Sequence, residues 1–218
     1  MKITLYYFKI PFWRAEVTRL SLYISDIPFN DHRIEGDEYN EFKKTGKLPN
    51  GKIAPFKQLP VLEVDGKIFA QTGAIARYCG KLSGLYPKDD DYKSALIDQI
   101  IEAAQDINFL VTLSGRDKDP EKKKLAREIL TTRHLPKWFQ YLENLNNQND
   151  QSVFFVGKYL TIADLAIWRL LGWLTSGLLD GVPMNILEPY ERLKKLREEI
   201  YNHPKVNEWM IKTYGKVI

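Results

Sequence analysis

The first part of the chain alternates short β-forming stretches with stretches of helical character. Residues 2–8 and 29–34 are short and rich in β-branched and aromatic side chains, which favours strands. Residues 13–24 repeat their apolar positions at helical spacing, and residues 38–44 predict a weaker helix. The stretch 45–58 holds two glycines and two prolines and is expected to be irregular.

From Lys57 the chain follows a different pattern, which reads KQLPVLEVDGKIFAQTGAIARY. Two β-forming runs, 61–64 and 67–70, flank Asp65-Gly66, which is a strong hairpin signal. Thr72 then stands where it would cap the next helix. The order β-α-β-α-β-β-α requires a mixed four-stranded sheet flanked by helices.

The second half of the chain has no defensible strand pattern. A turn-rich acidic stretch, SGLYPKDDD, separates it from the first half. We therefore predict an α/β domain at 1–82, a linker at 83–91 and an all-helical domain at 92–218. The expected helices of the second domain are 92–113, 121–145 with a kink at Pro136, 161–171, 189–200 and 204–214.

Composition narrows the possible functions. Among 218 residues, 44% are hydrophobic and 28% charged, as in ordinary globular proteins. The net charge is +4, and the basic and acidic residues are interspersed along the chain. This mixture of signs argues against nucleic-acid binding. A single cysteine, Cys79, excludes a disulfide framework and a Cys-rich zinc site, and His32, His134 and His203 offer no metal spacing. With no signal peptide or membrane span recognised, we expect a cytoplasmic protein that binds neither metal nor membrane.

Pro60 and Thr72 suggest the chemistry of a site. A proline at a strand entry removes a ladder donor and leaves neighbouring backbone free to pair with a ligand. A helix start offers N–H groups to a carboxylate. Together they suggest a site that holds an extended peptide with an anionic end.

Several motifs, distributed over nearly the whole chain, now point to one family. They are Tyr7-Phe8, Arg14-Ala15-Glu16, Asp31-His32-Arg33-Ile34, the run beginning at Lys57, and GKYLTIADLAIW at 157–168. In these the chain resembles cytosolic glutathione transferases, most closely the sigma class. The resemblance implies a thioredoxin-like first domain, a helical second domain and glutathione as co-substrate.

The implied reaction is attack of the glutathione thiolate on a hydrophobic electrophile. The resemblance makes Tyr7 the hydroxyl donor to the thiolate. Tyr6 is the rival, and strand alternation sends the two rings to opposite faces. Arg14 is expected either to support the thiolate or to form a structural ion pair with Glu16 or another acid. No Cys or Ser stands between Tyr7 and Glu16, which argues against the branches that use those residues.

The resemblance also implies a set of glutathione contacts. Gln71 and Thr72 would hold the γ-glutamyl end, and Leu59 would offer its backbone to the cysteinyl part beside a cis bond to Pro60. Asp98 would reach across a homodimer interface to the γ-glutamyl amine. The remaining expected contacts, near the glycyl end, are Gln58, Tyr39 and Lys43.

Two departures leave the function open. The loop Lys9–Trp13 is longer and more apolar than the family's usual loop, which suggests either a flat apolar ligand or a covered site. The segment 45–55 is also longer. A tyrosine-type glutathione transferase acting in detoxification is the first hypothesis. A glutathione-dependent isomerase of the prostaglandin D synthase type and a non-enzymatic structural or interaction protein are the alternatives.

Overall fold

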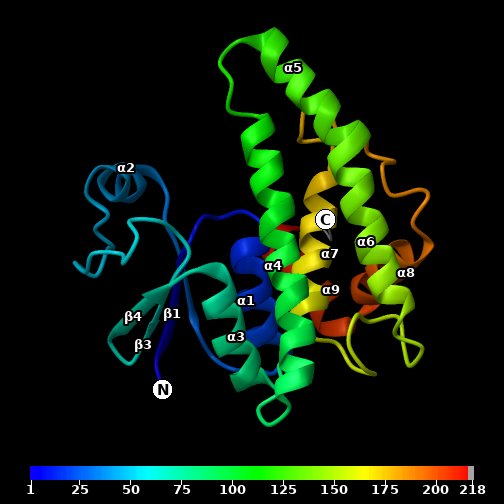
Figure 1. Ribbon diagram of the computed structural model, residues 1–218. Helices are drawn as coiled ribbons and strands as arrows, with labels where there is room; N and C mark the ends of the chain where they lie inside the picture. Colours follow the sequence, from blue (N-terminus) through cyan, green and yellow to red (C-terminus); the bar gives the residue numbers. More distant parts are fainter. Residues whose placement is uncertain (216–218) are drawn as a thin grey trace.

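The computed structural model describes residues 1–215 and begins with a mixed sheet (Figure 1). Strand β1 (Ile3–Tyr7) pairs in parallel with β2 (Asn30–Arg33) and antiparallel with β3 (Val61–Val64), and β4 (Lys67–Ala70) completes the order β2-β1-β3-β4. The predicted mixed four-stranded sheet is therefore confirmed.

Two helices lie between this sheet and the rest of the molecule. Helices α1 (Trp13–Ile24) and α3 (Thr72–Ser83) pack against each other beside the sheet, whereas α2 (Gly36–Thr45) lies apart from them (Figure 1). Helix α1 serves two cores, since Ala15 and Leu22 pack toward the sheet and Val17 and Leu20 pack toward the helical domain. The two domains thus share α1 as a common wall.

The hairpin between β3 and β4 forms as predicted. Asp65 and Gly66 have φ values of 47° and 82°, and this left-handed pair matches the twist of the flanking strands. The predicted cap of α3 is wrong. Gln71 takes the N-cap position without a side-chain hydrogen bond, and Thr72 is the first helical residue, 3% exposed.

The second domain is helical, as predicted, and its central helix is α7 (Figure 1). All residues of α7 except Trp173 are buried, in agreement with its nearly continuous apolar sequence. The last three residues of the predicted domain, 216–218, lie outside the described residues. The helices are α4 (Asp91–Ser114), α5 (Pro120–Ile129), α6 (Leu135–Asn147), α7 (Ile162–Leu174), α8 (Glu191–Asn202) and α9 (Pro204–Tyr214).

The long helix expected at 121–145 is interrupted next to Pro136. A π-helical turn, η1 (Leu130–His134), separates α5 from α6. Proline has no N–H, and its ring conflicts with the carbonyl four residues earlier, so the preceding turn widens. The predicted irregularity is present, as a π-turn before the proline.

Asp164 anchors the start of α7. Its carboxylate accepts hydrogen bonds from the backbone N–H groups of Phe155 at 2.8 Å and Thr161 at 2.7 Å, and from the Thr161 hydroxyl at 2.7 Å. Asp164 itself is 0% exposed. It therefore joins the loop before α7 to the helix start and completes a capping box with Thr161.

Candidate functional site

A cavity of about 120 Å³ lies where three segments of the first domain meet α4. It gathers six of the predicted site residues, together with Phe56, Ala70 and Gln105, which the sequence did not single out. Gln105 lies seven residues after Asp98 in α4, so the helical repeat places both on one side of that helix and could have pointed to it. The six predicted residues are Arg14, Gln58, Leu59, Pro60, Gln71 and Thr72.

The backbone in this cavity has two unusual features. The Leu59–Pro60 bond is cis, as predicted. Gln71 has a φ of 79°, a left-handed value that a residue with a side chain adopts at some cost. Strained residues of this kind cluster at ligand sites. Gln71 also precedes α3, whose first turn leaves N–H groups without partners in the helix, so the cavity suits a carboxylate.

Arg14 supplies positive charge at the cavity. Within residues 1–215 it makes no ion pair, and its Nε is buried without a hydrogen-bond partner. Glu16, the expected alternative partner, instead pairs with Arg19 at 3.0 Å. The structure therefore does not contain the Arg14–Glu16 pair and leaves the Arg14 guanidinium available to a ligand.

Tyr6 and Tyr7 differ in what their hydroxyls contact. The Tyr6 hydroxyl donates to Glu63 Oε2 at 2.9 Å, and its ring packs on His32 at a centroid distance of 5.3 Å. The Tyr7 hydroxyl makes no hydrogen bond to any described residue. Of the two, only Tyr7 has an uncommitted hydroxyl.

The protonation state of Tyr7 follows from its surroundings. Burial raises the pKa of Tyr7 to about 12, against the opposing charges of Arg14 and Arg19. The phenol is therefore protonated at neutral pH. It can donate a hydrogen bond but cannot act as a base there.

The segment Lys9–Trp13 is exposed at its start and buried at its end, since Lys9 and Ile10 are exposed. Trp13 is 0% exposed, and its Nε1 lies 3.5 Å from Asn108 Oδ1. Phe12 packs edge-on against Trp173, with centroids 4.8 Å apart. Both interpretations of this segment, a flat apolar ligand and a covered site, stay predictions.

The remaining predicted residues, Tyr7 included, do not line the cavity, although the Tyr7 phenol interacts electrostatically with Arg14, which does. Tyr39 is 38% exposed and packs edge-on against Phe8 at 5.3 Å, and Lys43 is exposed in the last turn of α2. Asp98 accepts hydrogen bonds from Arg77 Nε at 2.7 Å and from the Tyr86 hydroxyl at 3.0 Å. Its carboxylate is thus already paired within the chain, and the cross-subunit role stays a prediction.

The large aromatic residues of the helical domain mainly pack in its core or join the two domains. Trp168 is 3% exposed and Trp209 8% exposed. Trp209 and Tyr214 both donate hydrogen bonds to Glu16. Trp173, which packs on Phe12, borders the loop that follows Tyr7 and Phe8.

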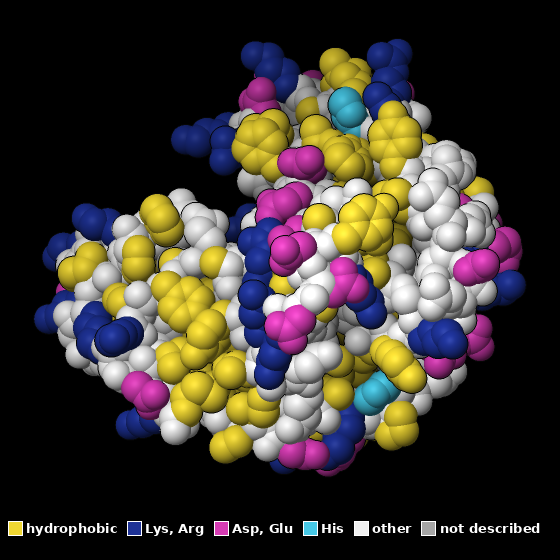
Figure 2. All heavy atoms as spheres, turned by 60° about the horizontal axis from the view of Figure 1, so that its bottom comes forward, with side chains coloured by type: hydrophobic (Ala, Val, Ile, Leu, Met, Phe, Trp, Pro, Cys, Tyr) yellow, Lys and Arg dark blue, Asp and Glu magenta, His cyan; other side chains and the backbone are white. Residues whose placement is uncertain are grey.

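The surface shows no single-sign patch on the face seen in Figure 2. Basic and acidic side chains lie side by side there, and hydrophobic side chains gather on the smaller lobe. Some of these charges are paired, as Arg77 is with Asp98 and Glu102. In residues 1–215, no helix is both long and apolar enough to cross a membrane.

Comparison with known proteins identifies the family of both domains. The family model for the glutathione S-transferase N-terminal domain matches residues 3–81, and that for the C-terminal domain matches residues 106–213. The hematopoietic prostaglandin D synthase of Gallus gallus is 32% identical over 199 residues, covering 91% of this chain and 90% of that protein.

Solved structures are similar over nearly the whole chain. The prostaglandin synthase D of Nilaparvata lugens has a TM-score of 0.82 and 29% identity, covering 97% of this chain and 98% of that one. A glutathione S-transferase of Necator americanus, described as monomeric, has a TM-score of 0.77 and 27% identity, covering 100% and 99%. With both domain models matched and the sequence similarity extending over both domains, this chain belongs to the glutathione S-transferase family, closest to its sigma-class members.

Proposed function

We propose that this protein activates the thiol of glutathione with the Tyr7 hydroxyl and transfers glutathione to hydrophobic electrophiles. The cavity carries the proposal, because it joins the unpaired Arg14, the cis-proline segment and the strained Gln71 in one place. Leu59 and Gln58 would bind the middle and glycyl parts of the tripeptide, and Gln71 and Thr72 its γ-glutamyl end. Tyr39 and Lys43 stay weaker candidates for the glycyl end. The proposal places the protein in the cytoplasm, where thiols are kept reduced.

The proposed chemistry requires only modest free energy. A free thiol of this kind has a pKa near ~8.5, and lowering it by one unit takes about 1.4 kcal/mol. A hydrogen bond to a charged acceptor supplies about 1.5–3 kcal/mol. The protonated Tyr7 phenol is suited to this task, and the Arg14 charge favours the same anion. No metal enters the proposed reaction.

The test is an ultraviolet titration of the bound glutathione thiolate against pH. We expect an apparent thiol pKa about one to two units below the free value, since one hydrogen bond of this strength accounts for that shift. Rates with a hydrophobic electrophile should rise with pH through the same value and then stay level, because Tyr7 does not ionise in that range. Absence of binding, or an unshifted pKa, would favour the non-enzymatic alternative.

Isomerisation is a second candidate function. It is favoured by the 32% identity to a protein named hematopoietic prostaglandin D synthase. The same activated thiolate serves both reactions. Product analysis with a prostaglandin endoperoxide and with a simple aryl electrophile distinguishes them, because isomerisation regenerates glutathione whereas conjugation consumes it.

We also propose that two copies form a homodimer through the face of α3 and α4 that holds Arg77 and Asp98. Phe56 is 58% exposed beside the cavity, and a second copy could cover such a side chain. Light scattering across a concentration series should give twice the mass of one chain. The mass of a single chain throughout would instead match the description of the Necator americanus relative as monomeric.

A further inference from the structure

The loop between β1 and α1 is held almost entirely through its backbone carbonyls. The Phe8 and Ile10 carbonyls accept hydrogen bonds from Arg19 at 2.9 and 3.0 Å. The Pro11 carbonyl accepts from Arg169 Nε at 3.1 Å and Nη2 at 2.5 Å. The Phe12 carbonyl accepts from the first turn of α1. Buried arginines thus satisfy an irregular segment that lacks a sheet ladder of its own.

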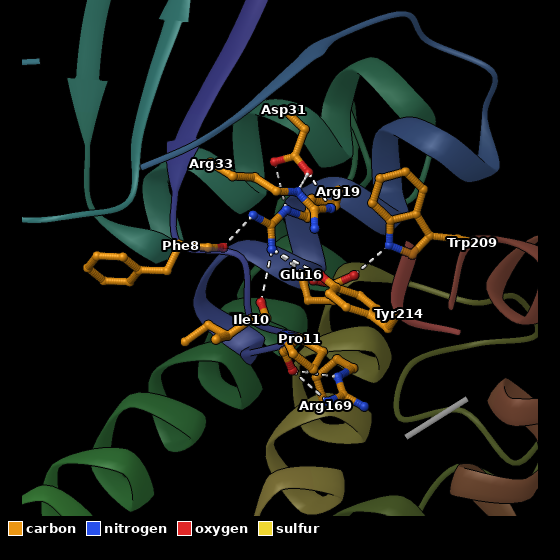
Figure 3. A network of polar contacts seen from close by, with 10 residues as sticks. All are labelled: Phe8, Ile10, Pro11, Glu16, Arg19, Asp31, Arg33, Arg169, Trp209 and Tyr214. Carbon is orange, nitrogen blue, oxygen red and sulfur yellow. Dashed lines mark hydrogen bonds and ion pairs between the residues drawn. The ribbon is translucent and has the colours of Figure 1, made fainter. Parts of the chain in front are cut away.

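Arg19 connects this loop to three other elements. It is 0% exposed and contacts Asp31 of β2 at 2.9 Å and Glu16 of its own helix at 3.0 Å (Figure 3). It also donates to the Tyr214 hydroxyl of α9 at 3.2 Å. Asp31 in turn accepts from Arg33 at 2.8 Å. A buried cation with this many partners has little freedom to move without leaving one unpaired.

Glu16 extends the network into the helical domain. Its carboxylate accepts from Trp209 Nε1 at 2.5 Å and from the Tyr214 hydroxyl at 2.7 Å, both from α9 (Figure 3). Glu16 is 0% exposed, so these contacts replace water that the carboxylate would otherwise bind. Glu16 and Arg19 thereby join helix α9 to the loop, although Tyr214 of α9 and Glu16 are 198 positions apart in the sequence.

We propose that this network, from α9 through Glu16 and Arg19 to the Phe8 and Ile10 carbonyls, positions Tyr7 and Arg14 for thiolate stabilisation. The inference rests on the proposed function. Tyr7 ends β1 and Arg14 opens α1, so the loop between them sets their separation. Glu16, Arg19 and Tyr214 are positioning residues, because they touch no reacting atom. Arg19 acts through the loop and also lies over the Tyr7 ring, 5.9 Å from its centroid.

The test uses Glu16→Gln and Tyr214→Phe, measured by the thiol titration and by turnover. We expect the bound thiol pKa to rise by about 0.5–1 unit and turnover near pH 6.5 to fall about three- to tenfold, since small displacements weaken a directional hydrogen bond strongly. Glutathione affinity should stay within about twofold, because the cavity lining is untouched. If Glu16→Gln does not fold, Tyr214→Phe decides alone, since it removes only a hydroxyl.

Tyr190→Phe is the matched control. It removes another partly buried tyrosine hydrogen bond, to the Pro136 carbonyl at 3.1 Å, far from the loop in sequence and contacts. It should lower the melting temperature comparably and leave the thiol pKa unchanged. In a Tyr7→Phe background, Tyr214→Phe should add less than about a twofold effect, because coupled residues are not additive.

The outcomes separate the two proposals. A wild-type thiol pKa equal to the free value would remove the proposed function and the network's role with it. A lowered wild-type pKa that Glu16→Gln and Tyr214→Phe leave unchanged would overturn the positioning role alone. Full additivity of Tyr214→Phe with Tyr7→Phe would overturn the positioning of Tyr7, because the effect of Tyr214→Phe would then not depend on the Tyr7 hydroxyl.

Discussion

The Tyr7→Phe variant is expected to bind glutathione almost as well as the wild type while losing about ten- to a hundredfold in turnover. The lost hydroxyl hydrogen bond acts on the thiolate, and about 1.5–3 kcal/mol of preferential stabilisation corresponds to that range. The bound thiol pKa should move up toward the free value. Steady-state kinetics below pH 7 measure the effect best, because the thiolate fraction is then most sensitive to its pKa.

Tyr6→Phe is the internal control for this prediction. Tyr6 is a neighbouring buried tyrosine of the same strand, but its hydroxyl is engaged with Glu63. Its loss should reduce stability by about 1 kcal/mol and leave the thiol pKa in place. If Tyr7→Phe kept full turnover and Tyr6→Phe lost it, the catalytic hydroxyl would belong to Tyr6 and the assignment to Tyr7 would be wrong.

Asp164→Ala is expected to lower the free energy of unfolding by about 3–5 kcal/mol without changing the chemistry. The substitution leaves the Phe155 and Thr161 N–H groups without their partner in a fully buried site. Urea unfolding and the thiol titration together check both halves of the statement. A stable variant, or one that folds but no longer binds glutathione, would contradict it.

Asp119→Ala provides a matched comparison, and pH provides a second one. Asp119 caps α5 by the same kind of bond but is exposed, so its loss should cost about 1 kcal/mol.

Burial raises the pKa of Asp164 to about 6, despite the opposing hydrogen bonds. The folded state therefore binds this proton more tightly than the unfolded state, and the Asp164 contribution to stability decreases as pH rises from about 4 to 6. The Asp164→Ala penalty should be larger at pH 5 than at pH 7.5.

Local sequence signals predicted the fold well where one short segment determines the structure. The Asp65-Gly66 pair produced its hairpin, and helix α1 occupies the expected residues, because turn chemistry and apolar periodicity act over a few positions. The prediction that Thr72 caps α3 was wrong because it also relied on a local signal alone. A hydroxyl at a helix start favours a cap, but the left-handed backbone of Gln71 shifted the helix boundary by one residue.

The site was predicted only in part, because its remaining features depend on distant contacts. The cis-proline segment and the Gln71-Thr72 pair were found through short motifs that resemble known family members. Arg19 gave no such signal, since its partners lie as far away as Tyr214 of α9. Gln105 likewise reaches the cavity only because α4 packs against the first domain. Such pairings depend on how the two domains dock, which no local pattern encodes.

The way the loop before α1 is held has a consequence for how this enzyme family diversifies. The bonds from Arg19 and Arg169 end on main-chain carbonyls, so they do not depend on which side chains stand at those positions. Lys9 and Ile10 are exposed, and Ile10 keeps 44% of its surface open. Substitutions there can change what the outer surface recognises while the backbone keeps its course. Evolution, or a laboratory library, can therefore vary the molecular surface at these two positions without rebuilding the loop.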